Sequence, residues 1–250
     1  MIDFLRHYSR QEYLTPGAAQ TVELIAETVR PDESSLLLDV ACGKLEAACA
    51  LAGRFACRIV AMDIYDPLIH YAAAKAWLLN LRDLVSVLRA DGKRLPVRAA
   101  AFDAAYCIGA PSIVGIEPCL RELARAVKPC PEPAEGPGGH VIVSDIVWRT
   151  KPQQPLGSEW MWVAAMRQLS RDEYAALIEA AGLRVERVHV HPRSDWHDYW
   201  HPMADVAREA RASGDAADIT FADEVERGIE MERRAVDAFL DYATFIARKR

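Results

Sequence analysis

The sequence has no long uncharged stretch of the kind that crosses a membrane. Its longest run without Asp, Glu, Lys or Arg covers residues 104–116, which is 13 residues, whereas a membrane-spanning helix needs about 20 apolar residues. The first ten residues contain Asp3, Arg6 and Arg10 and lack the apolar core of a signal peptide. The sequence therefore predicts a cytoplasmic protein with no membrane partner.

An excess of basic residues is also absent. Thirty Lys and Arg residues stand against 36 Asp and Glu residues, which gives a formal net charge of -6. A protein whose main partner is nucleic acid usually carries a basic surface. We therefore expect a small-molecule substrate and no nucleic-acid partner, and the sequence makes no prediction of the oligomeric state.

Two short motifs are missing. The six cysteines never occur as Cys-x-x-Cys and most lie in apolar runs, which favours buried thiols over zinc ligands or disulfides. The pattern Gly-x-Gly-x-x-Gly is absent as well, which argues against a nicotinamide dinucleotide site. We predict no metal site from these patterns.

Short apolar runs alternate with helical segments between residues 34 and 147. This alternation is typical of βαβ units and a mainly parallel sheet. We predict a single α/β domain, Rossmann-like, with a seven-stranded, mostly parallel sheet and helices on both faces. The expected strands are Ser35–Val40, Cys57–Met62, Val85–Arg89, Phe102–Ile108, His140–Ile146, Leu183–Val190 and Tyr242–Ala247.

The segments around this alternating region have their own character. Residues 1–33 are expected to form an N-terminal lid with a helix that opens at Thr15-Pro16. The Rossmann-like core then takes residues 34–190, a helical cap takes 191–240, and the last strand takes 241–250. Within the cap, the apolar spacing of Phe221 to Leu240 predicts one helix.

The chemically informative stretch is the end of the first strand. The apolar run Leu36–Leu38 leads to Asp39 and then to a glycine turn at Gly43 before a helix. Such a turn directs backbone N–H groups toward a ligand at the carboxyl edge of the sheet. Asp63 follows Gly43 by twenty residues, at the end of the second strand, where a carboxylate can accept both hydroxyl protons of a ribose.

These residues resemble the class I S-adenosylmethionine-dependent methyltransferases, in the small-molecule subgroup. Asp39, Cys42 and Gly43 fit the family pattern Asp-x-Gly-Cys-Gly-x-Gly, while Ala41 and Leu45 stand at the other two glycine positions. The resemblance implies S-adenosyl-L-methionine as the cofactor. It also implies that residues 130–137 are an eight-residue insertion. The residues it assigns to cofactor binding are Asp39, Ala41, Cys42, Gly43, Asp63, Ile64, Asp91, Gly92 and Ile108.

Methyl transfer requires that the acceptor is aligned and sometimes that a proton is removed from it. Ser112 and Asp145 follow predicted strands at the carboxyl edge, so they are candidates for this task, with caps as the alternative reading. Tyr13 is a further candidate, since in related methyltransferases such an N-terminal segment folds over the cofactor. Trp148, at the end of the fifth strand, is expected to contact the substrate.

Histidines and tryptophans are concentrated between residues 189 and 202. One hypothesis is an acceptor pocket with walls from Trp196, Tyr199 and Trp200, in which His197 or His201 takes the proton. A second is a metal site, because His197 and His201 are spaced to share one helix face. A third is an amphipathic hinge in which the tryptophans pack on the sheet.

The sequence thus favours an enzyme that transfers a methyl group from S-adenosyl-L-methionine to a small molecule. The alternative is an inactive Rossmann-like protein that binds this cofactor, or a related nucleoside, as a regulatory or binding module. The replacement of a family glycine by Leu45 is the feature that favours the alternative.

Overall fold

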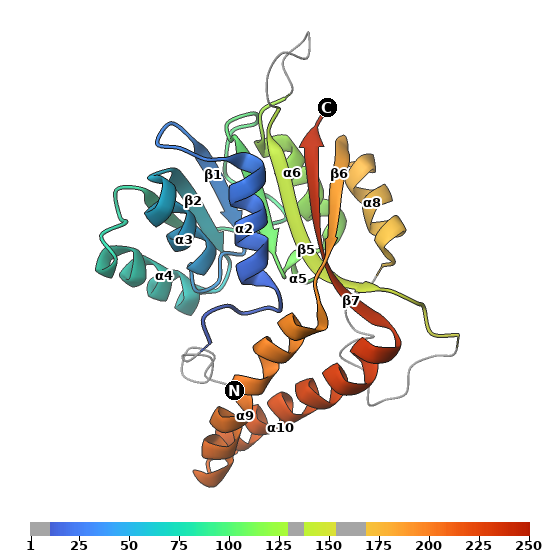
Figure 1. Ribbon diagram of the computed structural model, residues 1–250. Coiled ribbons are helices and arrows are strands. Elements are labelled where there is room, and N and C mark those ends of the chain that lie inside the picture. The colour runs from blue at the N-terminus through green and yellow to red at the C-terminus, as the bar shows by residue number, and fades with distance from the viewer. Residues whose placement is uncertain (1–10, 130–137, 154–168) are drawn as a thin grey trace.

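The computed structural model describes residues 11–129, 138–153 and 169–250 of the chain. A seven-stranded sheet forms its centre, in the order β3-β2-β1-β4-β5-β7-β6 (Figure 1). Strands β1 to β5 pair in parallel, and β7 runs antiparallel to both β5 and β6. This confirms the expected mostly parallel sheet. The strands are β1 Leu36–Val40, β2 Arg58–Asp63, β3 Val85–Arg89, β4 Ala104–Ile108, β5 His140–Trp148, β6 Leu183–Val190 and β7 Leu240–Lys249.

Helices cover both faces of the sheet, as expected (Figure 1). One face packs against α2 Ala18–Val29, α3 Glu46–Phe55 and α4 Asp66–Leu78. The other packs against α5 Pro111–Val114, α6 Ile116–Ala126 and α8 Arg171–Ala180. Because side chains alternate along a strand, Leu37 joins the first of these cores and Leu38 the second.

Local signals set several element boundaries. Ser170 and Glu173 form a capping box at the start of α8, and the helix ends before Gly182, whose φ angle is 86°. Strand β4 begins two residues later than expected, because Phe102 makes only an isolated bridge to Val127. All five described cysteines are free thiols, and no described helix has the length and apolar character of a membrane span.

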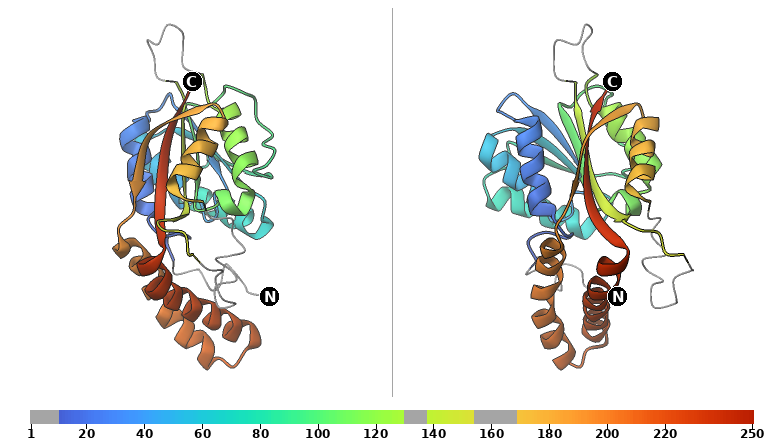
Figure 2. Two further views of the ribbon diagram at one scale, coloured as in Figure 1. Left: turned by 90° about the vertical axis from the view of Figure 1, so that its right-hand side faces the viewer. Right: turned by 45° about the vertical axis from the view of Figure 1, so that its right-hand side comes forward.

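The cap is a hairpin of two helices, α9 Arg193–Ala212 and α10 Ala216–Met231. The hairpin extends away from the sheet on the side where the parallel strands end (Figure 2). The single helix expected for Phe221 to Leu240 is wrong at its end: α10 continues as the π-helix η2 Glu232–Val236, but Leu240 starts β7. Leu240 is buried as the pairing partner of Trp148, so sheet pairing overrides its helical spacing.

The N-terminal lid divides into two parts. Helix α2 begins at Ala18, later than Thr15-Pro16 suggests, and buries Val22, Leu24 and Ile25 against the sheet. Residues 11–17, which we call the strap, lie across the carboxyl edge and line the cavity described below. Residues 1–10 of the expected lid and the insertion 130–137 lie outside the described residues.

Candidate functional site

A cavity of about 480 Å³ opens at the carboxyl ends of β1, β2 and β4. It lies where the strand order reverses between β1 and β4, which is the usual ligand position in an open α/β sheet. Tyr13, Leu14 and Thr15 of the strap form one wall. The structure brings all the residues expected to bind the cofactor to this cavity, namely Asp39, Ala41, Cys42, Gly43, Asp63, Ile64, Asp91, Gly92 and Ile108.

The loop after β1 keeps the backbone of a glycine-rich turn with fewer glycines. Ala41, Gly43 and Leu45, at the three glycine positions of the family pattern, have φ angles of 58°, 53° and 69°. Residues other than glycine are strained in this left-handed region, because they carry a Cβ atom. The Leu45 side chain is completely buried among the residues under α3 and does not line the cavity. Leu45 therefore leaves the cavity open.

Asp39 places a partnerless carboxyl oxygen beside the cavity. Asp39 is 3% exposed, and its Oδ2 atom has no hydrogen-bond partner in the described structure. Burial, with a further contribution from the charge of Asp63, raises the pKa of Asp39 to about 8, although the Tyr106 hydroxyl opposes the rise. This carboxyl would be stabilised by a cationic ligand group.

Asp63 fixes the glycine turn. Its Oδ2 accepts a hydrogen bond of 3.0 Å from the Gly43 N–H, and its Oδ1 accepts one of 3.0 Å from the Tyr65 N–H. A carboxylate offers about four lone-pair positions. Two acceptor positions therefore remain for a ligand such as a ribose diol.

Apolar side chains gather at the same cavity. Ile64, Tyr65 and Ile113 line it and are 58%, 43% and 73% exposed. Exposed apolar groups around a cavity are typical of a ligand site, because a flat apolar ligand would cover them. Ile64 is predicted from the sequence, whereas Tyr65 and Ile113 are not, although Tyr65 directly follows Asp63 and Ile64 at the end of β2.

Asp145 lies beneath the cavity wall. Its Oδ2 accepts a hydrogen bond of 2.9 Å from the Ser112 N–H, and its Oδ1 accepts one of 3.0 Å from the Ser112 hydroxyl. The Tyr174 hydroxyl donates to Oδ2 at 3.3 Å. Asp145 does not line the cavity. Its contacts with Ser112 instead hold α5, the helix that carries Ile113, in place.

Tyr13 is the one predicted proton-transfer residue that lines the cavity. Burial raises the pKa of Tyr13 to about 12, and the negative charge of the nearby Glu12 contributes to this rise. The phenol is therefore protonated at neutral pH, and its hydroxyl is suited to donate a hydrogen bond to a ligand.

The residues expected to form the acceptor pocket lie elsewhere in the described structure. His197 and His201 stack on each other with ring centroids 3.5 Å apart, and neither lines the cavity. Trp196 is buried against Tyr242, with their ring centroids 5.9 Å apart. The ring of Trp200 covers Gly228 of α10, and Trp148 packs beside the Trp196 cluster.

Tyr199 is nearer to the strap than the other predicted acceptor residues. Its carbonyl accepts a hydrogen bond of 2.6 Å from the Gln11 amide, and it lines a second cavity of about 430 Å³ between the strap and α9. Tyr13 and Thr15 line both cavities. The two spaces therefore lie on either side of the strap.

The histidine segment does not assemble metal ligands. The Asp195 carboxylate lies 2.8 Å from Nδ1 of His191 instead of facing His197 and His201. Among the residues that the structure describes, no group of three or more His, Cys, Asp and Glu side chains is placed to hold a metal ion.

Comparisons with known proteins agree with this architecture. Residues 38–130 match the Methyltransferase domain family. The O-methyltransferase cnsE of Penicillium expansum is 22% identical over 182 residues, which are 68% of this chain but only 62% of that protein. The chain therefore spans less than two thirds of the length of this relative.

Two solved structures share the fold over almost the whole chain. One is a SAM-dependent methyltransferase from Thiobacillus denitrificans in complex with S-adenosyl-L-homocysteine, with a TM-score of 0.79 and 18% identity, covering 99% of this chain and 98% of that one. The other is the [4+2]-cyclase SpnF, with a TM-score of 0.76 and 24% identity, covering 93% and 81%. Residues 38–130 thus match a methyltransferase domain, and the fold shared with these structures agrees with the resemblance of the sequence to the class I S-adenosylmethionine-dependent methyltransferases.

Proposed function

We propose that the chain binds S-adenosyl-L-methionine in the 480 Å³ cavity and transfers its methyl group to a small-molecule acceptor. The observation that carries this proposal is the pair of buried carboxyl groups at the ends of β1 and β2, Asp39 and Asp63, which line one cavity. The volume lies within the range of about 300 to 1,000 Å³ that is usual for small-ligand sites.

The residues present fit the parts of the cofactor. Asp63 has acceptor positions left for the ribose hydroxyls, and the partnerless Asp39 oxygen suits the cationic amino group. Ile64 and Ile113 offer apolar surface to the adenine ring, with Asp91 nearby for its amine. Glycine at position 92 is needed for space, because a Cβ there would lie 2.9 Å from Val114.

The cofactor supplies a methyl group bound to a positively charged sulfur, which is ready for in-line displacement. The protein then has to align the acceptor and exclude water. The strap performs the second task by closing the cavity with Leu14 and Thr15. Tyr13, protonated at neutral pH, holds an acceptor or cofactor oxygen by donating a hydrogen bond.

We place the acceptor on the side of the second cavity. Asp195 and Asp198 of α9 line it together with Glu12, and no Lys or Arg stands among its described lining residues. An anionic acceptor would be repelled there, so the acceptor class is neutral or cationic. Of the predicted substrate residues Trp148, Trp196, Tyr199 and Trp200, the placement supports Tyr199. The predicted bases, His197 and His201, line neither cavity, although Nδ1 of His197 lies 3.8 Å from the Asp198 carboxylate at the second one.

The first test is titration of S-adenosyl-L-methionine and S-adenosyl-L-homocysteine into Asp63→Asn by calorimetry. We expect the dissociation constant to rise about 10- to 100-fold, because a hydrogen bond to a charged group contributes about 1.5–3 kcal/mol. Asp66→Asn is the matched control: it removes the same charge three residues later, from an exposed side chain that pairs with Arg89.

Equal affinities of Asp63→Asn and the unchanged chain would refute the role of Asp63. Methyl transfer is then followed with radiolabelled cofactor on panels of neutral, cationic and anionic small molecules. If the chain binds the cofactor but labels no compound in any panel, the result favours the binding-module alternative over an enzyme.

A further inference from the structure

Tyr242 is completely buried near the start of β7. Its ring packs edge to face with those of Trp196 and His191, at centroid distances of 5.9 and 5.4 Å. Tyr242 lines neither the 480 Å³ cavity nor the one beside it. Any influence of Tyr242 on the cavity therefore has to pass through another residue.

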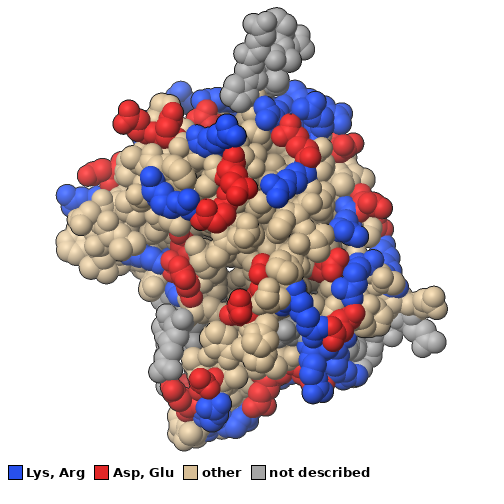
Figure 3. Space-filling model, viewed as in Figure 1, with Lys and Arg blue, Asp and Glu red and all other residues tan. Residues whose placement is uncertain are grey.

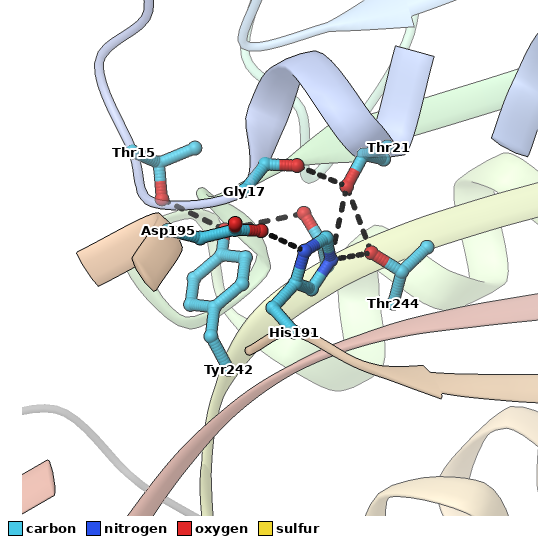
Figure 4. A network of polar contacts seen from close by, with 8 residues as sticks. Thr15, Gly17, Thr21, His191, Asp195, Tyr242 and Thr244 are labelled. Atoms are coloured by element: carbon cyan, nitrogen blue, oxygen red, sulfur yellow. Dashed lines mark hydrogen bonds and ion pairs between the residues drawn. The ribbon is translucent and has the colours of Figure 1, made fainter. Parts of the chain in front are cut away.

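The Tyr242 hydroxyl connects the strap to the middle of β5 and, through it, to the residue that follows β4. It accepts a hydrogen bond of 2.7 Å from the Thr15 hydroxyl (Figure 4). It also lies 3.2 Å from Oγ of Ser144, and that oxygen accepts a hydrogen bond of 3.2 Å from the Gly109 N–H. Two residues that line the cavity, Thr15 and Gly109, are thus joined through one buried hydroxyl group.

Thr15 crosses directly over Gly109. A Cβ placed on Gly109 would lie 2.6 Å from Cβ of Thr15, and the φ angle of Gly109 is 72°. This approach leaves no room between the strap and the end of β4. The position of Thr15 therefore determines where the strap meets the cavity wall formed by Ile108, Gly109 and Ala110.

We propose that Tyr242 is a positioning residue, which holds Thr15 against Gly109 and thereby sets the affinity of the cavity for the cofactor. The inference rests on the proposed function, in that the 480 Å³ cavity is the cofactor site. Tyr242 touches no ligand in this scheme, and its hydroxyl acts through Thr15.

A second set of polar contacts on β7 offers a matched control. The Thr244 hydroxyl, on the same face of β7, lies 2.8 Å from the Thr21 hydroxyl and 2.8 Å from Nε2 of His191. His191 also pairs with Asp195 at the start of α9 (Figure 4). Thr244 is as buried as Tyr242, but neither of its direct partners, Thr21 and His191, lines the 480 Å³ cavity or contacts Thr15 in the described structure.

The experiment measures the dissociation constant of S-adenosyl-L-homocysteine for the unchanged chain and for the variants Tyr242→Phe, Thr15→Val, Thr15→Ser, Thr244→Val and the Tyr242→Phe/Thr15→Val pair. Tyr242→Phe and Thr15→Val should each weaken binding about three- to tenfold, because each removes one partner of the same hydrogen bond. The double variant should bind no more weakly than the weaker single variant, since both remove the same interaction. Thr15→Ser keeps the hydroxyl and should bind more tightly than Thr15→Val, and Thr244→Val should bind like the unchanged chain.

Hydrogen exchange of the strap amides gives a readout that needs no cofactor. Exchange of residues 11–17 should be faster in Tyr242→Phe and in Thr15→Val than in Thr244→Val. Unchanged affinity and exchange in Tyr242→Phe would overturn the inference, and so would equal losses in Thr244→Val or additive losses in the double variant. If the unchanged chain binds neither S-adenosyl-L-methionine nor S-adenosyl-L-homocysteine, the proposed function fails. The proposal that Tyr242 sets the affinity of the cavity for the cofactor then fails too. Faster exchange in Tyr242→Phe would still show that the Tyr242 hydroxyl holds the strap.

Discussion

The Asp39 carboxyl makes the stability of the protein depend on pH in a direction opposite to that of most acidic groups. Its folded pKa of about 8 lies above its ordinary value of 3.8, chiefly because of burial. The folded protein therefore keeps a proton that the unfolded chain releases between about pH 4 and pH 8. It follows that Asp39 lowers the free energy of unfolding as the pH rises through this window.

Asp39→Asn should remove this dependence. In the cofactor-free protein, we expect the free energy of unfolding of the variant, minus that of the unchanged chain, to grow from pH 4 to pH 8 by a few kcal/mol, since one pKa unit corresponds to about 1.4 kcal/mol. Urea unfolding at a series of pH values measures the difference, in which the other titrating groups cancel. A flat difference would show that Asp39 is ionised in the folded protein.

In the strained turn after β1, we expect substitution by glycine to have opposite effects on stability at Ala41 and at Leu45. Ala41→Gly relieves a left-handed φ and loses a single half-buried methyl group, so the free energy of unfolding should stay the same or rise by up to about 1 kcal/mol. Leu45→Gly relieves similar strain but empties a fully buried site, so the free energy of unfolding should fall by about 2–4 kcal/mol. Urea unfolding compares the two, and a stabilised Leu45→Gly would contradict the buried placement of that side chain.

Among the helices, the cap depends on close packing between α9 and α10. A Cβ added to Gly228 would lie 2.4 Å from the Trp200 ring, whereas one added to Gly53 of α3 would meet no atom within 4 Å. Gly228→Ala should therefore destabilise the hairpin by about 1–3 kcal/mol, while Gly53→Ala should stabilise the protein by about 0.5–1 kcal/mol. Thermal unfolding, with hydrogen exchange to locate the change in the cap, measures both. Equal shifts of the same sign would mean that Trp200 does not pack on Gly228.

The sequence predicts the elements that depend on local patterns better than those that depend on distant partners. The strands before Val147 are apolar and bounded by turn residues, so their positions and the place of Asp39 and Asp63 follow from neighbouring residues. Leu240 fits a helix by spacing but becomes a strand residue through pairing with Trp148. Tyr242 gave no local signal, because its importance comes from Thr15, 227 residues away.

At the scale of the whole molecule, the sheet and the cap have different roles. The sheet brings every predicted cofactor residue to one edge, because parallel strands end on the same side. The placement of the acceptor residues could not be inferred in this way, since it depends on how the α9–α10 hairpin meets the strap. On the face shown in Figure 3, basic and acidic side chains are interspersed around the hollow between the sheet and the cap.

The position of β7 inside the sheet bears on how the molecule is made. Strand β7 is the last described strand in the chain, yet it lies between β5 and β6 and is the only described partner of β6 in the sheet. While a ribosome is still adding residues before Leu240, β6 has no neighbour and the exposed edge of β5 is open to wrong pairing. The strap is made before the sheet, but its anchor, Tyr242, follows Thr15 by 227 residues. The nascent chain can therefore carry its helices and parallel strands long before it has a closed cavity.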